Sequence, residues 1–342
     1  MIKNLHKLLL IAPLIAGCNQ NPSTMNQPYQ WPENISTPTV EKKAKEFLMH
    51  GDKRVDEYYW LNERENPKVI DYLKAENAYV DTMMSGTKEL QEKLFQEMKG
   101  RIKEKDESVP VFTNGYFYYN RYEEGKQYPI FCRKKESLDA PEEIMFDQNK
   151  MAEGHKYYSV GIIRISDNNE LAAFTTDHVS RRLYNLQIKN LTTGEVYPET
   201  IPNVERGSVV WAADNKTIFY ILQDTVTLLG YQVYRHTLGT DPRNDVLMYE
   251  EKDDRYYLDI ERTRSKKYVY IVSNMNEVST EFRLLDAANP TGAFKIFEPR
   301  KLDFQYHIDH AADGKFYILT DWEAPNFRVM TAEDGKTGKD NW

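Results

Sequence analysis

Cysteine is nearly absent from this chain of 342 residues, which contains only Cys18 and Cys132. Two thiols cannot build the disulfide framework that stabilises many small secreted domains. The longest apolar run, residues 8–16, is too short to span a bilayer. The fold must therefore be stabilised by a hydrophobic core, for which a chain with 40% hydrophobic residues has ample material.

An excess of basic residues is also missing, because 45 Lys and Arg stand against 53 Asp and Glu. The net charge of -8 argues against binding to a phosphate backbone, which needs basic clusters. We therefore expect no nucleic-acid partner. An acidic surface suits solubility, and it also suits cationic ligands.

A nucleophile in a recognisable setting is absent as well. The Gly-x-Ser-x-Gly elbow of many serine hydrolases does not occur, and Ser159, in the closest approach to it, is predicted to lie in a strand. His307 and His310 lie in a segment that looks extended, so their rings should point to opposite faces and not share a metal. Residues 335–339 only superficially resemble a phosphate loop, and a solvated turn is expected there. We predict no catalytic residue, metal site or cofactor in this chain.

The first residues have the pattern of an export signal. Lys3 and Lys7 precede the apolar run, and Ala16-Gly17 stand directly before Cys18. We interpret residues 1–17 as a lipoprotein-type signal peptide and Cys18 as a lipidation site, followed by a polar tether over residues 18–39. An ordinary cleaved secretory signal and an uncleaved anchor remain alternatives. The lipid would attach the protein to a membrane of the bacterial cell envelope. It would also leave Cys132 as the sole thiol, expected to be buried and structural.

Residues 40–104 favour helices. A first short helix is expected over residues 40–48, a second from about Pro67 to Met84 and a third from about Lys88 to Lys99. The apolar positions have mixed helical spacing, Pro67 suits a first turn and Gly100 suits a stop.

After this segment, five polar turns are each followed by an alternating apolar strand, at intervals of about 50 residues. These strands begin at Tyr116, Leu171, Ile218, Tyr268 and Phe316. The turns contain Asn, Asp, Gly, Ser and Lys, several of which tolerate the backbone angles of a tight reversal. The period is typical of β-propeller blades. We therefore predict an all-β, incomplete propeller over residues 105–342, preceded by the short helical segment.

Several blocks of the sequence closely resemble the prolyl oligopeptidase family, and within it the oligopeptidase B (protease II) type. The first blocks are residues 50–61 and 66–77. Residues 238–257, 279–287 and 326–330 are similar to propeller stretches of that type and come in the same order. The resemblance extends from about Val40 to Trp342.

This resemblance implies a seven-bladed propeller that caps an α/β-hydrolase domain and limits access by size, in a serine peptidase that cleaves short peptides after Arg or Lys. The Ser, Asp and His of the family lie in the hydrolase domain, which this chain does not include, so no catalytic residue is carried over. We expect the first five blades of a truncated or partial reading frame, inactive alone, whose helical segment would pack on the hydrolase domain. A lipid-anchored propeller that binds peptides or a protein without catalysis is the alternative.

Overall fold

The computed structural model describes residues 29–342. The chain divides into two compact units between Lys103 and Glu104. The predicted signal peptide, the Cys18 lipidation site and the first half of the predicted tether lie outside the described residues. Among the described residues, no helix is long and apolar enough to cross a membrane.

The first unit opens with a hairpin where a helix was predicted. Strands β1 (Lys45–Met49) and β2 (Asp52–Asp56) pair antiparallel through a two-residue turn. His50 and Gly51 in this turn have φ of 54° and 82°. Two successive positive φ values match the turn that best suits the twist of a tight hairpin. The prediction of a helix over residues 40–48 was therefore wrong.

The other two predicted helices are confirmed. After η1 (Tyr59–Asn62), α1 (Pro67–Met83) begins with Pro67 in its first turn, and the Asn66 side chain caps it by accepting from the Lys68 backbone N–H. The short η2 (Ser85–Thr87) leads into α2 (Lys88–Gly100). No residue of α2 is buried, and Leu90, Phe95 and Met98 are exposed.

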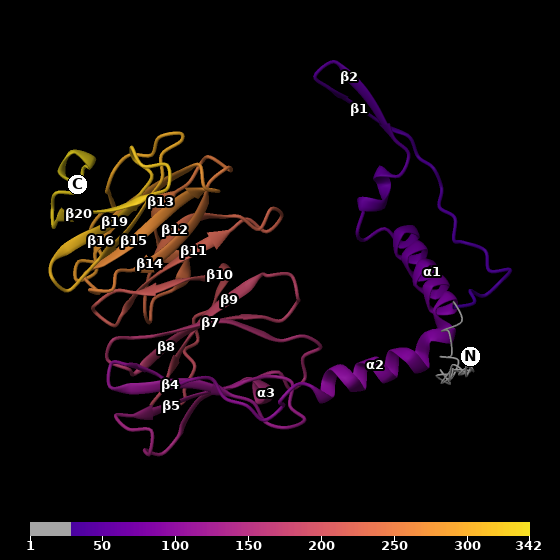
Figure 1. The fold of residues 1–342 in the computed structure, drawn as a ribbon, viewed down its shortest axis with the longest axis horizontal. Helices are drawn as coiled ribbons and strands as arrows, with labels where there is room; N and C mark the ends of the chain where they lie inside the picture. The colour runs from indigo at the N-terminus through magenta and orange to yellow at the C-terminus, as the bar shows by residue number, and fades with distance from the viewer. Residues whose placement is uncertain (1–28) are drawn as a thin grey trace, which may run out of the picture. The chain divides into compact units, whose positions relative to one another are not determined.

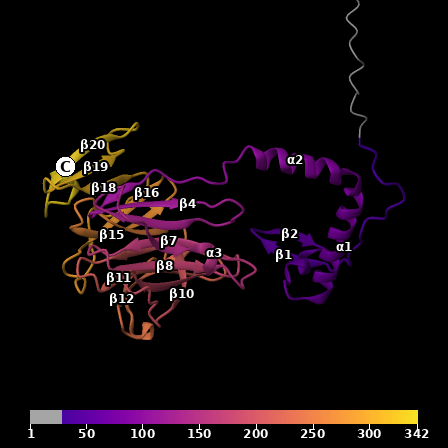
Figure 2. The same cartoon turned by 90° about the horizontal axis from the view of Figure 1, so that it is seen from below.

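The second unit consists of antiparallel sheets with short helical insertions (Figures 1 and 2). Its strands are β3 (Val111–Thr113), β4 (Tyr116–Arg121), β5 (Ile130–Lys135), β6 (Glu143–Asp147), β7 (Ser159–Ile165), β8 (Leu171–Asp177), β9 (Tyr184–Asn190), β10 (Ile201–Trp211), β11 (Thr217–Gln223), β12 (Gly230–Thr237), β13 (Val246–Glu250), β14 (Tyr257–Arg262), β15 (Tyr268–Met275), β16 (Ser279–Asp286), β17 (Lys295–Ile296), β18 (Tyr306–His310), β19 (Lys315–Thr320) and β20 (Arg328–Glu333). The helical insertions are α3 (Gln148–Met151), η3 (Pro242–Asn244) and η4 (Lys339–Asn341).

These strands form five consecutive blades. The first is β3–β6, the fourth is β14–β17 and the fifth is β18–β20. The second and third share the long strand β10. Ile201 and Val204 of β10 pair with β9, whereas Val209, Val210 and Trp211 pair with β11, and a bulge separates the two parts. One strand thus closes the second blade and opens the third.

The five predicted turns are confirmed by their backbone angles. Each contains a residue of positive φ immediately or shortly before the second strand of its blade; these residues are Asn114, Asn169, Asn215, Lys266 and Gly314. Because neighbouring strands are antiparallel, these turns lie at one end of the blades, which we call the turn end. The connections between second and third strands lie at the other end, which we call the loop end.

The core is divided into layers between successive blades. Phe146 and Phe174 join the first two blades, Leu186 and Trp211 belong to the layer between the second and third, and Ile260 belongs to the next. Tyr306 and Phe282 lie between the fourth and fifth blades. On the other face of the fifth blade, the paired residues Leu319 and Val329 are 44% and 67% exposed. This face has no covering sheet among the described residues.

Candidate functional site

The first strands of the second, third and fourth blades, β7, β10 and β14, carry charged groups and lie next to one another. Strand β7 contacts β10, and β10 contacts β14. The Arg164 guanidinium of β7 forms an ion pair with Glu261 of β14 and also donates to the Val209 carbonyl at 3.2 Å. Trp211 fixes the arginine backbone in return, because its indole N–H donates to the Arg164 carbonyl at 2.8 Å. The ion pair thus joins the second blade to the fourth across the third.

Two carboxylates of β14, Asp259 and Glu261, lie close to this arginine, and a third, Glu205 of β10, lies close to Asp259. Burial raises the pKa of all three groups. For Glu261, the charge of Arg164 opposes the effect of burial on the pKa. Glu205 accepts a hydrogen bond from the Ser208 hydroxyl at 2.7 Å. Strands β7, β10 and β14 also carry three arginines, Arg164, Arg206 and Arg262, so acidic and basic groups are equal in number on them. Burial makes proton binding to the three acids easier than in water.

At the turn end, a second charged group links three blades; we call Asn114, Asp167, Arg262 and Lys266 the turn cluster. Asp167 pairs with Arg262 at 2.7 Å and with Lys266 at 3.0 Å. The Lys266 ammonium also donates to the Asn114 side chain at 2.6 Å. Burial alone would raise the pKa of Asp167, but hydrogen bonds from Lys266 and Arg262 hold it below its usual value. The cluster connects blades one, two and four.

At the loop end, a groove of about 880 Å³ lies between the first and second blades. It is lined by the loop of residues 122–128, the segment after α3, the start of β7 and Arg206 of β10. At its edge, the ring of Tyr158 stacks on His178 at a centroid distance of 4.8 Å, and the ring of His155 lies tilted beside His178 at 4.6 Å. Burial, together with the nearby His155, lowers the pKa of His178.

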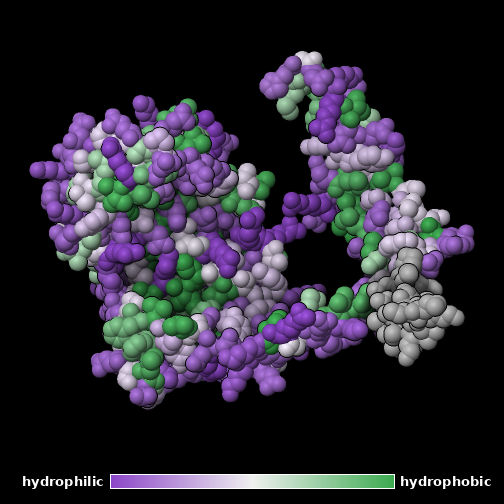
Figure 3. Space-filling model, in the orientation of Figure 1, coloured by the Kyte–Doolittle hydropathy of each residue, from purple (hydrophilic) through white to green (hydrophobic). Residues whose placement is uncertain are grey.

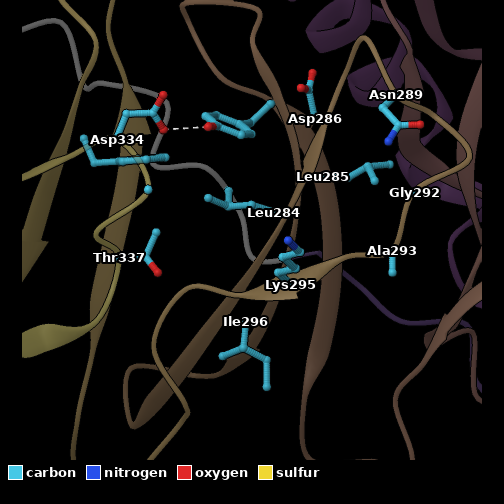
Figure 4. Close-up of a pocket in the computed structure, with 13 residues that line it drawn as sticks. Leu284, Leu285, Asp286, Asn289, Gly292, Ala293, Lys295, Ile296, Asp334 and Thr337 are labelled. Carbon is cyan, nitrogen blue, oxygen red and sulfur yellow. Dashed lines mark hydrogen bonds between the residues drawn. The ribbon is translucent and has the colours of Figure 1, made fainter.

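A smaller cavity of about 420 Å³ lies between the fourth and fifth blades (Figure 4). Leu284 and Ile296 form part of its apolar wall, while Asp286, Lys295 and Thr337 supply polar groups. Asp334 is held by the Tyr268 hydroxyl at 2.5 Å and by the Lys267 ammonium. The cavity has no serine or cysteine nucleophile in its lining.

The structure keeps apart the residues that sequence reasoning weighed as chemical groups. Ser159 begins β7 and pairs with Asp177 in the sheet, which confirms it as a strand residue. His307 is exposed and His310 is buried on opposite faces of β18, as predicted. Cys132 is fully buried, also as predicted. Residues 334–335 form a turn before η4. Among residues 29–342, no group of three or more His, Cys, Asp or Glu side chains could hold a metal.

Two histidine contacts were not predicted from the sequence: the partner of His310 lies 45 residues away and that of His236 nine residues away. His310 Nδ1 lies 2.8 Å from the Ser265 hydroxyl. That hydroxyl also contacts Thr263 and accepts from the Lys267 backbone N–H, and His310 Nε2 has no partner. With no carboxylate to orient the imidazole, this pair is a contact between blades rather than a nucleophile and its base. In the second contact, His236 Nδ1 lies 2.7 Å from one carboxylate oxygen of the buried Asp245. The Tyr220 hydroxyl donates to the other oxygen at 2.9 Å.

The comparisons with known proteins agree with this architecture. Residues 38–342 match the family model described as "Prolyl oligopeptidase, N-terminal beta-propeller domain". Dipeptidyl aminopeptidase BI of Pseudoxanthomonas mexicana is 40% identical over 328 residues, which are 90% of this chain and 45% of that protein. Protease 2 of Moraxella lacunata is 34% identical over 302 residues, which are 86% of this chain and 43% of that protein.

Among solved structures, oligopeptidase B from Leishmania major superposes with a TM-score of 0.81 at 25% identity, over 88% of this chain and 45% of that one. The chain spans about half the length of the curated relatives it matches. No α/β-hydrolase domain is present among residues 29–342, whose sheets are antiparallel. The chain belongs to the prolyl oligopeptidase family and comprises its N-terminal β-propeller region.

Proposed function

We propose that this chain is the propeller part of an exported serine peptidase of the oligopeptidase B type, which hydrolyses short peptides after Arg or Lys. The observation that carries this proposal is the family match over residues 38–342, together with the solved oligopeptidase B structures of the same fold. The propeller limits access by size, and a hydrolase domain outside this chain supplies the catalytic groups.

The exposed apolar surfaces support a further domain. Leu90, Phe95 and Met98 of α2 are each more than half exposed. An amphipathic helix of this kind is stabilised in water mainly by packing its apolar side against a partner. In the proposed protein, the partner of α2 is the hydrolase domain, and further blades cover the open face of the fifth blade.

Two carboxylates on the inner strands support a preference for basic peptides. Glu205 and Asp259 form no ion pair with a described residue, whereas Glu261 pairs with Arg164. Low-dielectric walls of one charge sign concentrate ligands of the other sign. The test is hydrolysis of matched fluorogenic peptides with Arg, Lys, Pro or Ala before the scissile bond, with the full-length protein. Equal rates for all four peptides would refute the basic preference, and no turnover would refute the peptidase.

Release of dipeptides is a second candidate activity, because dipeptidyl aminopeptidase BI is 40% identical to this chain. A free and an acetylated version of the same tetrapeptide separate the two activities. An endopeptidase cleaves both forms, whereas a dipeptidyl aminopeptidase cleaves the free peptide and not the acetylated one. The 342 residues alone should show no hydrolysis of either peptide.

Anchoring through a lipid on Cys18 is part of the same proposal and is supported by the residues before that cysteine. The full-length protein should fractionate with membranes and take up labelled fatty acid. Cys18→Ser should abolish the labelling and release the protein from the membrane fraction. Equal labelling of the variant would contradict lipidation at this position.

A further inference from the structure

The loop-end groove differs in charge from the rest of the molecule. Lys126, Lys156 and Arg206 line it, and Glu153 is the one carboxylate in its lining. The whole chain, in contrast, has a net charge of -8. None of these three basic side chains forms an ion pair or a hydrogen bond with a described residue. The groove therefore presents unneutralised positive charge to a ligand.

Arg206 is held at the groove by its backbone, which leaves its guanidinium free. It lies in the bulged part of β10, where the register shifts between Val204 and Val209. The Thr175 hydroxyl donates to the Arg206 carbonyl at 3.1 Å and accepts from the Ile162 backbone N–H at 3.1 Å. Bulges of this kind re-aim side chains.

The neighbouring residues confirm the orientation of this segment. Glu205 turns away from the groove, because its carboxylate accepts from Ser208 and lies against Gly230 of β12. Its negative charge is therefore not presented on the same side as the arginine. Gly161 on β7 allows the close approach of Thr175, since a Cβ there would lie 2.4 Å from the threonine hydroxyl.

The groove also has a strand edge that a peptide can use. Ser159, Val160 and Gly161 line it, and their strand β7 is the edge of its sheet, paired with β8. An edge strand offers backbone donors and acceptors to an extended chain that adds to the sheet. The aromatic rings of Tyr122, Tyr128 and Tyr157 add apolar contact area.

We propose that this groove binds the C-terminal carboxylate of a short peptide through Arg206. The inference rests on the proposed function as a peptidase, and it names a feature of the substrate: a free carboxyl end. An arginine guanidinium can hold a carboxylate with two parallel hydrogen bonds, which makes it more selective than a lysine. Lys126 and Lys156 add positive charge that favours the anionic end of the peptide, and the edge of β7 orients its backbone.

The test is equilibrium binding to the full-length protein after treatment with a serine-reactive sulfonyl fluoride. Two N-terminally dansylated tetrapeptides differ only in a free or an amidated C-terminus, and mass spectrometry verifies that both stay intact. We expect the free acid to bind about tenfold more tightly, which corresponds to about 1.4 kcal/mol. Because binding is measured without turnover, a failure of the peptidase assignment does not affect the result.

Three variants assign the effect to Arg206. Arg206→Ala should reduce the preference for the free acid to less than about twofold, and Arg206→Lys should give an intermediate value. Arg181→Ala removes an exposed positive charge near the same end but outside the groove lining, so it should leave the preference unchanged. Unchanged thermal midpoints verify folding, as expected for an exposed side chain.

Three results would overturn the proposal: equal binding of the two peptides by the unmodified protein, a preference that survives in Arg206→Ala, or an equal loss in Arg181→Ala. The last result would assign the effect to the general charge of this end of the propeller. Tighter binding of the amidated peptide would also exclude a carboxylate site.

Discussion

Gly161 is the residue at which the second blade has least room for a side chain. A Cβ at this position would lie 2.4 Å from the Thr175 hydroxyl and 2.8 Å from a ring carbon of Tyr184. We predict that Gly161→Ala destabilises the propeller by about 1–3 kcal/mol, because neighbouring groups in a packed core must shift. Urea unfolding of the full-length protein, followed by tryptophan fluorescence, measures the change.

Gly207 is a matched control, because it lies in β10 beside Arg206 and a Cβ there meets nothing within 4 Å. Its Gly207→Ala variant should unfold within about 0.5 kcal/mol of the unmodified protein. Similar losses of stability in the two variants would show that the backbone freedom of glycine matters at position 161, and not the close approach to Thr175.

Cys132 should be chemically inert in the folded protein. Burial raises the pKa of this thiol to about 12, and its side chain is fully buried. The thiolate is the reactive form, so a group with this pKa stays protonated at pH 8. In a Cys18→Ser background, we predict no labelling by iodoacetamide at pH 8 in the native state and full labelling in guanidinium. Rapid native labelling would contradict both the burial and the shifted pKa.

Among the structural elements, the five turns at the turn end of the blades combine local interactions with interactions between blades. Asp214 caps its own turn by accepting from the Lys216 and Thr217 backbone N–H groups. Asn168 and Asn169 also reach neighbouring blades, through Asn215 and the Asn114 carbonyl. The turn residues were predictable because asparagine and glycine tolerate positive φ. Their contacts with other blades were not, because the partners lie about 50 residues away.

Asp167 should make the stability of the propeller depend on pH. Its folded pKa lies below the ordinary value, so its contribution is present above pH 4 and is lost as the pH falls through the folded pKa. We predict that Asp167→Asn lowers stability by about 1–2 kcal/mol at pH 7, since it removes charge-assisted hydrogen bonds to Arg262 and Lys266. The variant should also lose less stability than the unmodified protein between pH 5 and pH 3, as measured by urea unfolding.

Asp313→Asn is the control for Asp167→Asn, because Asp313 lies in the equivalent turn of the fifth blade. Among the described residues, its carboxylate accepts hydrogen bonds only within its own hairpin, from the Lys315 backbone N–H and the Tyr317 hydroxyl. Its loss should change the stability less than the loss of Asp167. A larger effect at Asp313 would show that the local turn, and not the link between blades, dominates.

At the scale of the whole molecule, the blades of residues 104–342 include an apolar sheet face that none of their own sheets covers. Leu319 and Val329 are paired neighbours on this face of the fifth blade. Residues 29–342 expressed alone should therefore aggregate and bind the dye anilinonaphthalene sulfonate. We predict that the double variant Leu319→Lys, Val329→Lys reduces dye binding and aggregation. Light scattering and dye fluorescence measure both effects.

Val226→Lys is the control at this scale, because Val226 is 86% exposed in a loop away from a sheet face. It adds the same kind of charge and should change neither property. The one face drawn in the space-filling view has apolar residues in several places among polar ones, so the choice of positions rests on the strand register (Figure 3). Equal dye binding by the fragment and its double variant would refute this interpretation.

The sequence alone predicted the propeller and the five turns at its turn end. It also predicted two helices of the first unit correctly, out of three that were expected. Those features depend on local rules: alternation of apolar residues, turn residues that accept positive φ, and helix capping. The first predicted helix, over residues 40–48, was wrong. Its segment has some helical spacing, but the His50-Gly51 turn makes it a hairpin, and this two-residue signal was missed.

Only the tertiary structure decided which charged groups meet. Glu251 lies in the charged run of residues 250–255, yet its side chain is buried against Arg300, 49 residues further along the chain. The turn cluster, the Arg164 and Glu261 pair, and the free guanidinium of Arg206 arise in the same way. Sequence patterns report the local geometry of each strand, whereas contacts between blades depend on how successive blades pack against one another. For this reason, the fold could be predicted from residues, and the candidate sites could not.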